Sequence, residues 1–344
     1  MVTINDVAKA AGLSHMTVSR VINGDKRVRD ETKARVEEVI DQLGYIPSPS
    51  ARALASSNSL RILLIYTSAS KSYLSALLIG ALEEAGRAGH QVLVEKFDEA
   101  QFGSDLEAFI KNALKQAHAL ILPSPLADDM AIRRLVAAHN WPVCFLSAFS
   151  AGTDANRVCI DEKAAALDMM HCLIENGHKR VGFITGAKNH YSSLARLAGY
   201  EAALEEAGIV LDEQLVVEGD YTFDGGLPAA EKLLDLDDPP TAIFASNDDM
   251  AAAVLSVASR RGIRVPDTLS VAGFDDTPIA SSVYPRLATI KQPLDQLAVD
   301  AVRQVVDMVA KKGTDAGAKK KNTILGHELI RGESIAVPEQ VTTV

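Results

Sequence analysis

The sequence lacks the long apolar runs and the cysteine pattern of a membrane or secreted protein. No apolar stretch approaches the roughly 20 residues that cross a bilayer, and the first thirty residues contain no apolar signal-peptide core. The three cysteines, Cys144, Cys159 and Cys172, are odd in number and match no metal-binding or redox spacing. We therefore expect a cytoplasmic protein whose cysteines are small core residues.

The sequence also lacks the residue sets that catalysis requires. The eight histidines are scattered without metal-ligand spacing, and no nucleophile–base set or phosphate-binding loop is present. The segment Gly182–Gly186 is not a dinucleotide-binding fingerprint, because the third glycine and its spacing are missing. We expect a protein that is not an enzyme and that uses no metal ion or other cofactor.

What the chain does contain is enough apolar material for sizeable cores. Hydrophobic residues make up 47% of its 344 residues and charged residues 23%, which is ordinary for a globular protein of two or three domains. The net charge is −10, but residues 1–58 carry eight Lys and Arg against seven Asp and Glu. A nearly neutral N-terminal segment on an acidic body is compatible with binding of nucleic acid through a local basic surface.

The N-terminal segment predicts three short helices. Thr3 caps a first helix that stops at Gly12, and Ser14 caps a second helix over residues 15–22. A third helix, with apolar residues at helical spacing, covers residues 30–43. The first two helices meet across a tight turn, so we expect an all-α three-helix domain of the helix-turn-helix type.

A linker and an α/β region follow. Residues 47–59 are rich in Pro and Ser, and within them residues 50–55 could form a helix too short to persist alone. Beyond the linker, apolar strands alternate with amphipathic helices, which predicts two parallel sheets flanked by helices. A last helix, 294–311, and a strand near Ile324–Leu329 flank a polar run at 312–322, which we expect to be an exposed loop.

The N-terminal helices also carry a specific motif, Thr3-Ile-Asn-Asp-Val-Ala-Lys-Ala-Ala-Gly-Leu-Ser-His-Met-Thr-Val-Ser-Arg-Val-Ile-Asn23. This motif closely resembles the N-terminal signature of the LacI/GalR family of transcription regulators. The resemblance continues over almost the whole chain, at Leu43–Pro47, Asn176–Gly182, Arg196–Tyr200, Ser246–Met250, Gly273–Asp276 and Thr289–Pro293. It implies a helix-turn-helix domain, a hinge helix and a two-lobed α/β core like the periplasmic sugar-binding proteins.

The domain boundaries expected from this resemblance are 1–46 for the helix-turn-helix domain, 47–59 for the linker with its hinge helix, and 60–340 for the effector-binding core. Within the core, the N-lobe is expected to hold residues of about 60–160 plus 292–322, and the C-lobe about 161–291 plus 323–340. No leucine heptads follow Ile335, so we expect a homodimer rather than a larger assembly.

The expected function is that of a sequence-specific repressor of carbohydrate uptake or catabolism genes, released from double-stranded operator DNA by a small sugar effector. The alternative is a regulator whose DNA binding is promoted by a purine-like corepressor or by a partner protein. A solute-binding protein without a transcriptional role would share only the core fold.

The second helix is the expected DNA-reading helix. Arg20 can grip guanine O6 and N7, and the matching family position contacts bases; a phosphate contact is the alternative. His15 and Met16 match family specificity positions, with groove filling as their alternative. The matching family position implies that Leu54 of the hinge helix wedges into the minor groove, and contact with the dimer mate is the alternative. The full set predicted to contact DNA is Thr3, Ser14, His15, Met16, Thr17, Ser19, Arg20, Asn23, Ala51, Arg52 and Leu54.

The effector is expected in the cleft between the lobes, beyond the carboxyl ends of the strands. The resemblance makes Arg196, Asn247 and Asp275 effector contacts, whereas helix capping, surface exposure and turn formation are their alternatives. Tyr73 and Tyr221 are candidate stacking surfaces for a sugar ring, with core packing as the alternative. The full predicted set is Tyr73, Ser147, Arg196, Tyr221, Asn247, Asp248, Asp275 and Gln292.

Two departures from the family pattern leave the ligand open. Residues Ser68–Leu74 replace the Asp-x-x-Asn-Pro-Phe-Phe segment that many relatives carry after the first strand. Ser147 stands where some sugar regulators have an aspartate. The sequence therefore names neither the sugar nor the operator.

Overall fold

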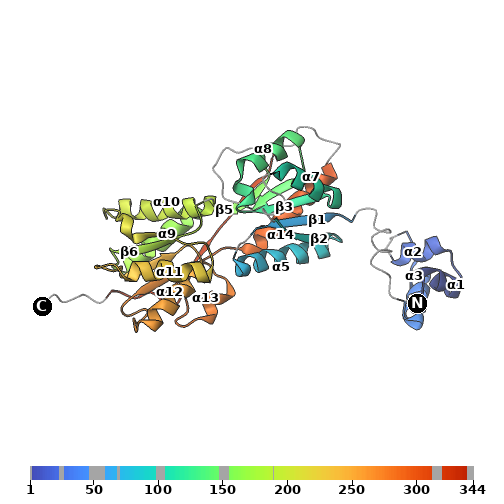
Figure 1. The fold of residues 1–344 in the computed structure, drawn as a ribbon. Coiled ribbons are helices and arrows are strands. Elements are labelled where there is room, and N and C mark those ends of the chain that lie inside the picture. The colour runs from blue at the N-terminus through green and yellow to red at the C-terminus, as the bar shows by residue number, and fades with distance from the viewer. Residues whose placement is uncertain are drawn as a thin grey trace. The chain divides into compact units, whose positions relative to one another are not determined.

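The computed structural model describes residues 2–22, 27–45, 59–67, 70–97, 105–146, 155–188, 190–311 and 320–338 (Figure 1). The chain divides into two compact units, Met1–Ser59 and Leu60–Val344. The described part of the first unit is helical, and the second is an α/β unit with two sheets.

The helical unit contains the three predicted helices, α1 (Ile4–Ala11), α2 (His15–Ile22) and α3 (Asp30–Leu43). The Thr3 hydroxyl accepts a bond from the Asp6 N–H, and the Asp6 carboxylate accepts one from the Thr3 N–H at 2.8 Å, so the two form a capping box. Gly12 ends α1 with φ +66°, a conformation that glycine adopts without strain. Buried apolar side chains from all three helices form a small core around Val7, Val18 and Val36.

The α/β unit has two six-stranded sheets among its described residues. The N-lobe sheet is entirely parallel, and its strands in spatial order are β11 (Asn322–Leu325), β5 (Arg157–Ile160), β4 (Val143–Leu146), β3 (Ala119–Pro123), β1 (Arg61–Tyr66) and β2 (Gln91–Lys96). The C-lobe sheet has the order β12 (Glu328–Ile330), β10 (Ala288–Lys291), β9 (Ser270–Asp275), β8 (Ala242–Ala245), β6 (Val181–Thr185) and β7 (Val216–Glu218). Only the described edge strand β12 is antiparallel to its neighbour in that sheet.

Helices cover both faces of each sheet (Figure 1). In β1, Ile62 and Leu64 pack on one face and Leu63 and Ile65 on the other, which is why all four residues from 62 to 65 are apolar. The N-lobe helices are α5 (Lys71–Arg87), α7 (Leu106–Gln116), α8 (Met130–His139) and α14 (Leu294–Lys311), with the 3-10 helix η1 (Leu126–Asp128). The C-lobe helices are α9 (Glu162–Glu175), α10 (Tyr191–Glu206), α11 (Phe223–Leu234), α12 (Asp248–Arg260) and α13 (Pro278–Ser282), with the 3-10 helix η2 (Glu213–Leu215).

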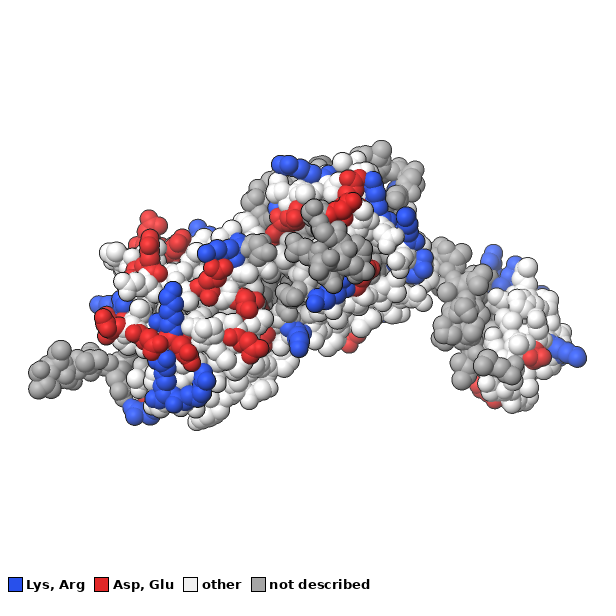
Figure 2. All heavy atoms as spheres, viewed as in Figure 1, with Lys and Arg blue, Asp and Glu red and all other residues white. Residues whose placement is uncertain are grey.

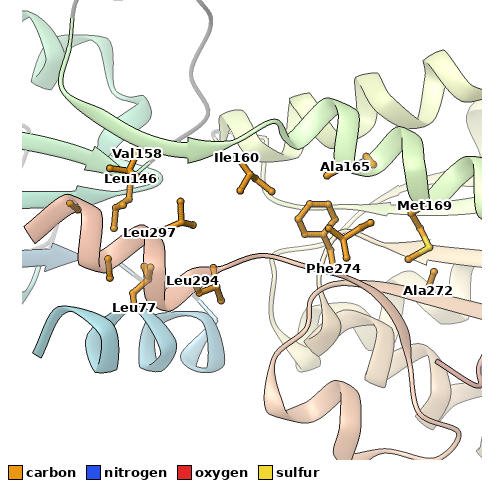
Figure 3. Close-up of a cluster of buried hydrophobic side chains, with 14 of the residues drawn as sticks. Leu77, Leu146, Val158, Ile160, Ala165, Met169, Ala272, Phe274, Leu294 and Leu297 are labelled. Carbon is orange, nitrogen blue, oxygen red and sulfur yellow. The ribbon is translucent and has the colours of Figure 1, made fainter. Parts of the chain in front are cut away.

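The chain passes between the lobes at three described connections, from β5 to α9, from β10 to α14 and from β11 to β12. One cluster of buried apolar residues runs through these connections from lobe to lobe. Figure 3 shows Leu146 and Leu297 in the N-lobe, Phe274 and Met169 in the C-lobe, and Ile160 between them. The two lobes therefore share a continuous core next to the connections.

Three strands differ from the sequence prediction. The strands β5 and β10 were not expected, because in each of them a charged end residue leaves only three uncharged residues in the run. The single strand expected near Ile324–Leu329 is wrong: residues 322–325 and 328–330 form two strands, one in each sheet. The break falls at Gly326 and His327, where the chain passes from one lobe to the other.

The three cysteines are free thiols in the core, as predicted. Burial raises the pKa of the Cys144 thiol, so this side chain behaves as a small apolar residue. In the part of the chain that the structure describes, no helix has both the length and the apolarity needed to span a bilayer.

Acidic and basic side chains are interspersed on the visible face of the α/β unit (Figure 2). Charged residues of this unit form ion pairs, such as Arg180 with Asp212 at 2.8 Å and Arg261 with Asp235 at 2.6 Å. Because these pairs lie near solvent, they contribute little to stability.

Substitution of Gly80 tests how closely α5 packs against α14. A Cβ atom at Gly80 would lie 2.4 Å from the backbone oxygen of Asp295, so Gly80→Ala should destabilise the α/β unit by about 1–3 kcal/mol. Gly86 in the same helix has no atom within 4 Å of its Cβ position, and Gly86→Ala should be neutral or stabilising by up to about 1 kcal/mol. Chemical denaturation of both variants is the measurement, and equal stabilities would contradict the packing.

Candidate functional site

A cavity lies between the two lobes of the α/β unit, with a volume of about 620 Å³ including the space open to solvent. Tyr73 and Leu146 come from the N-lobe, Tyr221 and Asn247 from the C-lobe, and Gln292 from a connection between them. The cavity sits beyond the carboxyl ends of β4, β8 and β9, where open α/β sheets place their ligands. The predicted effector residues that line it are Tyr73, Arg196, Tyr221, Asn247, Asp275 and Gln292; Ser147 lies outside the described residues.

Arg196 of α10 is buried in the cavity wall, and two of its three guanidinium nitrogens, Nε and Nη1, donate hydrogen bonds to neighbours. Its Nε donates to Glu162 Oε2 at 2.6 Å, and its Nη1 donates to the backbone oxygen of Ser246. The guanidinium carbon lies 3.6 Å from the centre of the Phe274 ring. Burial alone would lower the pKa of Arg196, but the nearby Glu162 and Asp275 outweigh it, so the pKa is raised and the group stays charged.

Asp275 ends β9 in a strained backbone conformation, with φ +114°, and Asp276 follows with φ +54°. Positive φ is uncommon in residues other than glycine and recurs at functional sites. Asp275 Oδ1 accepts a bond from Gln292 Nε2 at 2.6 Å and lies 3.8 Å from Arg196 Nη2. Burial raises the pKa of Asp275 well above its usual range, and the charge of Arg196 offsets this only in part.

Asn247 combines two structural tasks with its place in the cavity wall. Its Oδ1 accepts the Met250 N–H at 3.0 Å and so caps α12, as the alternative prediction proposed. Its Nδ2 donates to the Tyr221 backbone oxygen at 2.9 Å. Tyr221 has φ +67°, and its hydroxyl lies 3.1 Å from Ser192 Oγ. Asn247 therefore holds the backbone of Tyr221 in place, and Ser192 contacts the hydroxyl of its ring.

Asp248 has a different role from the one predicted. It does not line the cavity, and its carboxylate accepts bonds from the Thr277 N–H at 2.7 Å, the Thr277 hydroxyl at 3.0 Å and the Thr289 hydroxyl at 2.6 Å. Burial raises the pKa of Asp248 to about 7. The sequence placed Asp248 beside Asn247, but the first turn of α12 points the carboxylate toward β10, so it fastens this helix to the loop after β9.

Several cavity residues were not predicted. They are Ser70, Ser124, Leu146, Val158, Cys159, Ile160, Glu162, His190, Ser192 and Leu297. Among these residues, Glu162 has the largest effect on the charge of the cavity wall, because its carboxylate pairs with Arg196. No local signal marks it, since Glu162 and Arg196 are 34 positions apart and meet only when α9 packs on α10.

Two polar contacts join the lobes beside the cavity. The Ser70 hydroxyl, at the start of α5, donates to the Asp249 carboxylate at the start of α12. Elsewhere in the wall, Asp128 Oδ2 of the N-lobe accepts the Tyr191 N–H of α10 at 3.0 Å and the Ser124 hydroxyl at 2.8 Å. A ligand in the cavity is therefore placed next to contacts that depend on the relative position of the lobes.

Asp248→Asn should destabilise the α/β unit by about 1–3 kcal/mol, because an amide can accept fewer of the three bonds that converge on this carboxylate. Asp224→Asn is the matched control, since it removes an exposed carboxylate from the first turn of α11 and should change stability little. Urea denaturation of both variants is the measurement. Equal effects would contradict the structural role of Asp248.

The candidate DNA-binding surface is on α2 of the helical unit. His15, Met16 and Arg20 are exposed, Met16 by 65%, whereas Val18 and Val21 are buried. Ser14 caps the helix, with its Oγ accepting the Thr17 N–H at 3.1 Å. Of the other residues predicted to contact DNA, Thr3 is exposed, Thr17 and Ser19 are half-buried, and Asn23, Ala51, Arg52 and Leu54 lie outside the described residues.

A helix-turn-helix unit with an exposed reading face and a two-lobed α/β unit with a cavity between its lobes define a ligand-responsive transcription regulator. Comparison with known proteins supports this class of protein. The pattern of the bacterial regulatory proteins, lacI family, matches residues 3–48, and that of the periplasmic binding protein-like domain matches residues 170–335.

Relatives of known identity match over nearly the whole chain. Catabolite control protein A of Priestia megaterium is 34% identical over 318 residues, covering 92% of this chain and 95% of its own. The transcriptional repressor CytR of Escherichia coli is 34% identical over 338 residues, covering 98% and 97%. The protein therefore belongs to the LacI family of transcription regulators, as predicted.

Solved structures show the same fold. The lac repressor dimer bound to operator and the anti-inducer ONPF superposes with a TM-score of 0.78 at 29% identity, covering 97% of this chain and 99% of that one. The complex of the regulator CelR with cellobiose gives a TM-score of 0.71 at 26% identity, covering 97% and 100%. The predicted fold class, a helical DNA-binding domain on a two-lobed α/β core, is confirmed.

Proposed function

We propose that this protein is a homodimeric repressor in the bacterial cytoplasm that leaves its operator when a small sugar binds between the lobes of the α/β unit. The observation that carries the proposal is the cavity of about 620 Å³, whose walls come from both lobes. The relatives support a carbohydrate ligand, because one solved neighbour holds cellobiose.

The lining suits a sugar. Tyr73 and Tyr221 present aromatic surface for the apolar face of a pyranose or furanose ring. Asp275 and Gln292 offer an acceptor and an amide within 2.6 Å of each other, which suits adjacent hydroxyl groups. A ligand shifts the equilibrium between two arrangements of the lobes only if it binds one arrangement more tightly than the other. A ligand that contacts walls from both lobes meets this condition, because its contacts change when the lobes move.

An apolar surface on the N-lobe supports the homodimer. Ile79 and Leu82 of α5 are 56% and 52% exposed, and Val94 of the neighbouring edge strand β2 is 45% exposed. Large apolar side chains exposed on neighbouring elements can form part of a protein interface. A symmetric dimer would present two helix-turn-helix domains to the two halves of an operator, which mirrors the two-fold symmetry of such sites.

DNA reading is proposed for the exposed face of α2, with Arg20 as its specific contact. Arg20→Ala should lower the ratio of operator to non-specific affinity by about ten- to a hundredfold, because a bidentate contact to guanine is lost. The measurement is fluorescence anisotropy on an operator selected from random duplexes and on a scrambled duplex. Lys33→Ala, which removes an exposed cation from α3, is the control and should leave the ratio unchanged. Equal weakening of Arg20→Ala on both duplexes would contradict base reading.

Effector release is tested with mono- and disaccharides and purines, first by thermal unfolding and then by operator anisotropy. A sugar at about 100 times its Kd should stabilise the α/β unit by roughly 2.7 kcal/mol and lower operator affinity. Asp275→Ala should abolish the response while leaving operator binding intact. A purine that stabilises the protein and strengthens operator binding would contradict sugar release and favour the corepressor alternative. Ligand binding without any change in operator affinity would contradict the proposed function itself.

A further inference from the structure

Acidic side chains outnumber basic side chains around the cavity. Among the described residues that line it, Arg196 is the only lysine or arginine, whereas Glu162 and Asp275 are acids. Two further carboxylates, Asp128 and Asp249, lie one contact behind the wall, on the hydroxyl groups of Ser124 and Ser70. An anionic ligand would therefore enter a site with more negative than positive groups.

The charge of Arg196 is already balanced by a neighbouring carboxylate. Its side chain is 5% exposed and that of Glu162 is 10% exposed, so the pair is buried as a unit. Glu162 neutralises the guanidinium, the backbone oxygen of Ser246 occupies Nη1, and the Phe274 ring covers one face. An anion at the remaining nitrogen, Nη2, would lie beside Asp275, whose Oδ1 is 3.8 Å from it, and would meet a guanidinium that Glu162 already neutralises.

His190 does not supply a cation either. Its ring is half-buried in the cavity wall, 5.2 Å from the Tyr221 ring. Burial lowers the pKa of His190, the charge of Arg196 lowers it further, and Asp128 opposes them only in part. The imidazole is therefore neutral at pH 7 and acts as an aromatic and hydrogen-bonding surface.

The helix N-termini at the cavity are engaged as well. Helix N-termini attract anions through their free N–H groups. At α5 the Ser70 hydroxyl accepts one of these N–H groups, and at α12 the Asn247 side chain does the same. At α10, which follows His190, the Tyr191 N–H donates to the Asp128 carboxylate. Each of these three N-termini thus has an acceptor for one of its N–H groups, and at α10 this acceptor is negatively charged.

We propose that the cavity selects an uncharged polyhydroxyl ligand and rejects phosphorylated and carboxylate-bearing counterparts, and that Glu162 sets this selection by neutralising Arg196. The inference rests on the proposed function and narrows its ligand class to neutral sugars or sugar-like molecules. Glu162 is a specificity residue that acts through Arg196, because removal of its charge would leave the guanidinium with only the more distant Asp275 carboxylate, 3.8 Å away, and so open to pairing with an anion.

The test compares matched neutral and anionic probes on the full chain by isothermal titration calorimetry. The pairs are glucose with glucose 6-phosphate, ribose with ribose 5-phosphate, and galactose with galacturonate; inorganic phosphate is the anion alone. We expect the wild type to bind no anionic member more tightly than its neutral partner. Glu162→Gln keeps the size of the side chain and an acceptor for Arg196, and we expect it to bind at least one anionic probe about tenfold more tightly than the wild type does.

Glu201→Gln is the control, since it removes an exposed carboxylate from the same helix as Arg196 and should bind every probe as the wild type does. Circular dichroism checks that Glu162→Gln folds. If it does not fold, the affinities of the wild type for the neutral and anionic probes decide whether the cavity rejects anions. A wild type that prefers an anionic member of any pair would overturn the proposal, as would a folded Glu162→Gln variant without any gain. Operator affinity is read separately, so failure of sugar release would leave this result unaffected.

Discussion

The buried ion pair between Arg196 and Glu162 is the interaction on which the cavity depends. It joins α10 to the first residue of α9, and the same guanidinium also contacts the end of β8 through Ser246 and the end of β9 through Phe274. Four segments of the C-lobe thus converge on one side chain at the edge of the sheet where a ligand would sit. Loss of either partner would leave an unpaired charge in this wall, which is far more costly than loss of a surface pair.

The connection between lobes is the second constraint. A continuous apolar core runs past Ile160 and Leu294 beside the three connections, whereas the polar contacts of Ser70 with Asp249 and of Asp128 with Tyr191 border the cavity. Apolar packing resists separation of the lobes at the connections, and polar contacts can exchange for ligand or water. This arrangement allows the lobes to change their relative orientation without exposing the shared core.

Much of the fold was predictable because its signals are local. The caps at Thr3 and Ser14, the alternation of apolar strands with helices and the family motifs led to the correct class and to most of the residues that line the cavity. The strands β5 and β10 and the long-range pairing of side chains were not predicted. Strand β5 is a four-residue strand, and Glu162 meets Arg196 only through packing of two helices. Asp248 shows a further limit, because its neighbour Asn247 lines the cavity while the helical turn directs Asp248 away from it.

The central claim is that a ligand controls operator binding by changing how the two lobes meet. Replacement of the facing residues at the inter-lobe contact, Ser70→Cys together with Asp249→Cys, allows the lobes to be linked by oxidation. The decisive measurement is operator affinity of this protein, oxidised and reduced, with and without a sugar found to bind. The account predicts that the reduced protein responds to the sugar and that the oxidised protein does not. A full response in the oxidised protein, with the cross-link verified by mass, would contradict it.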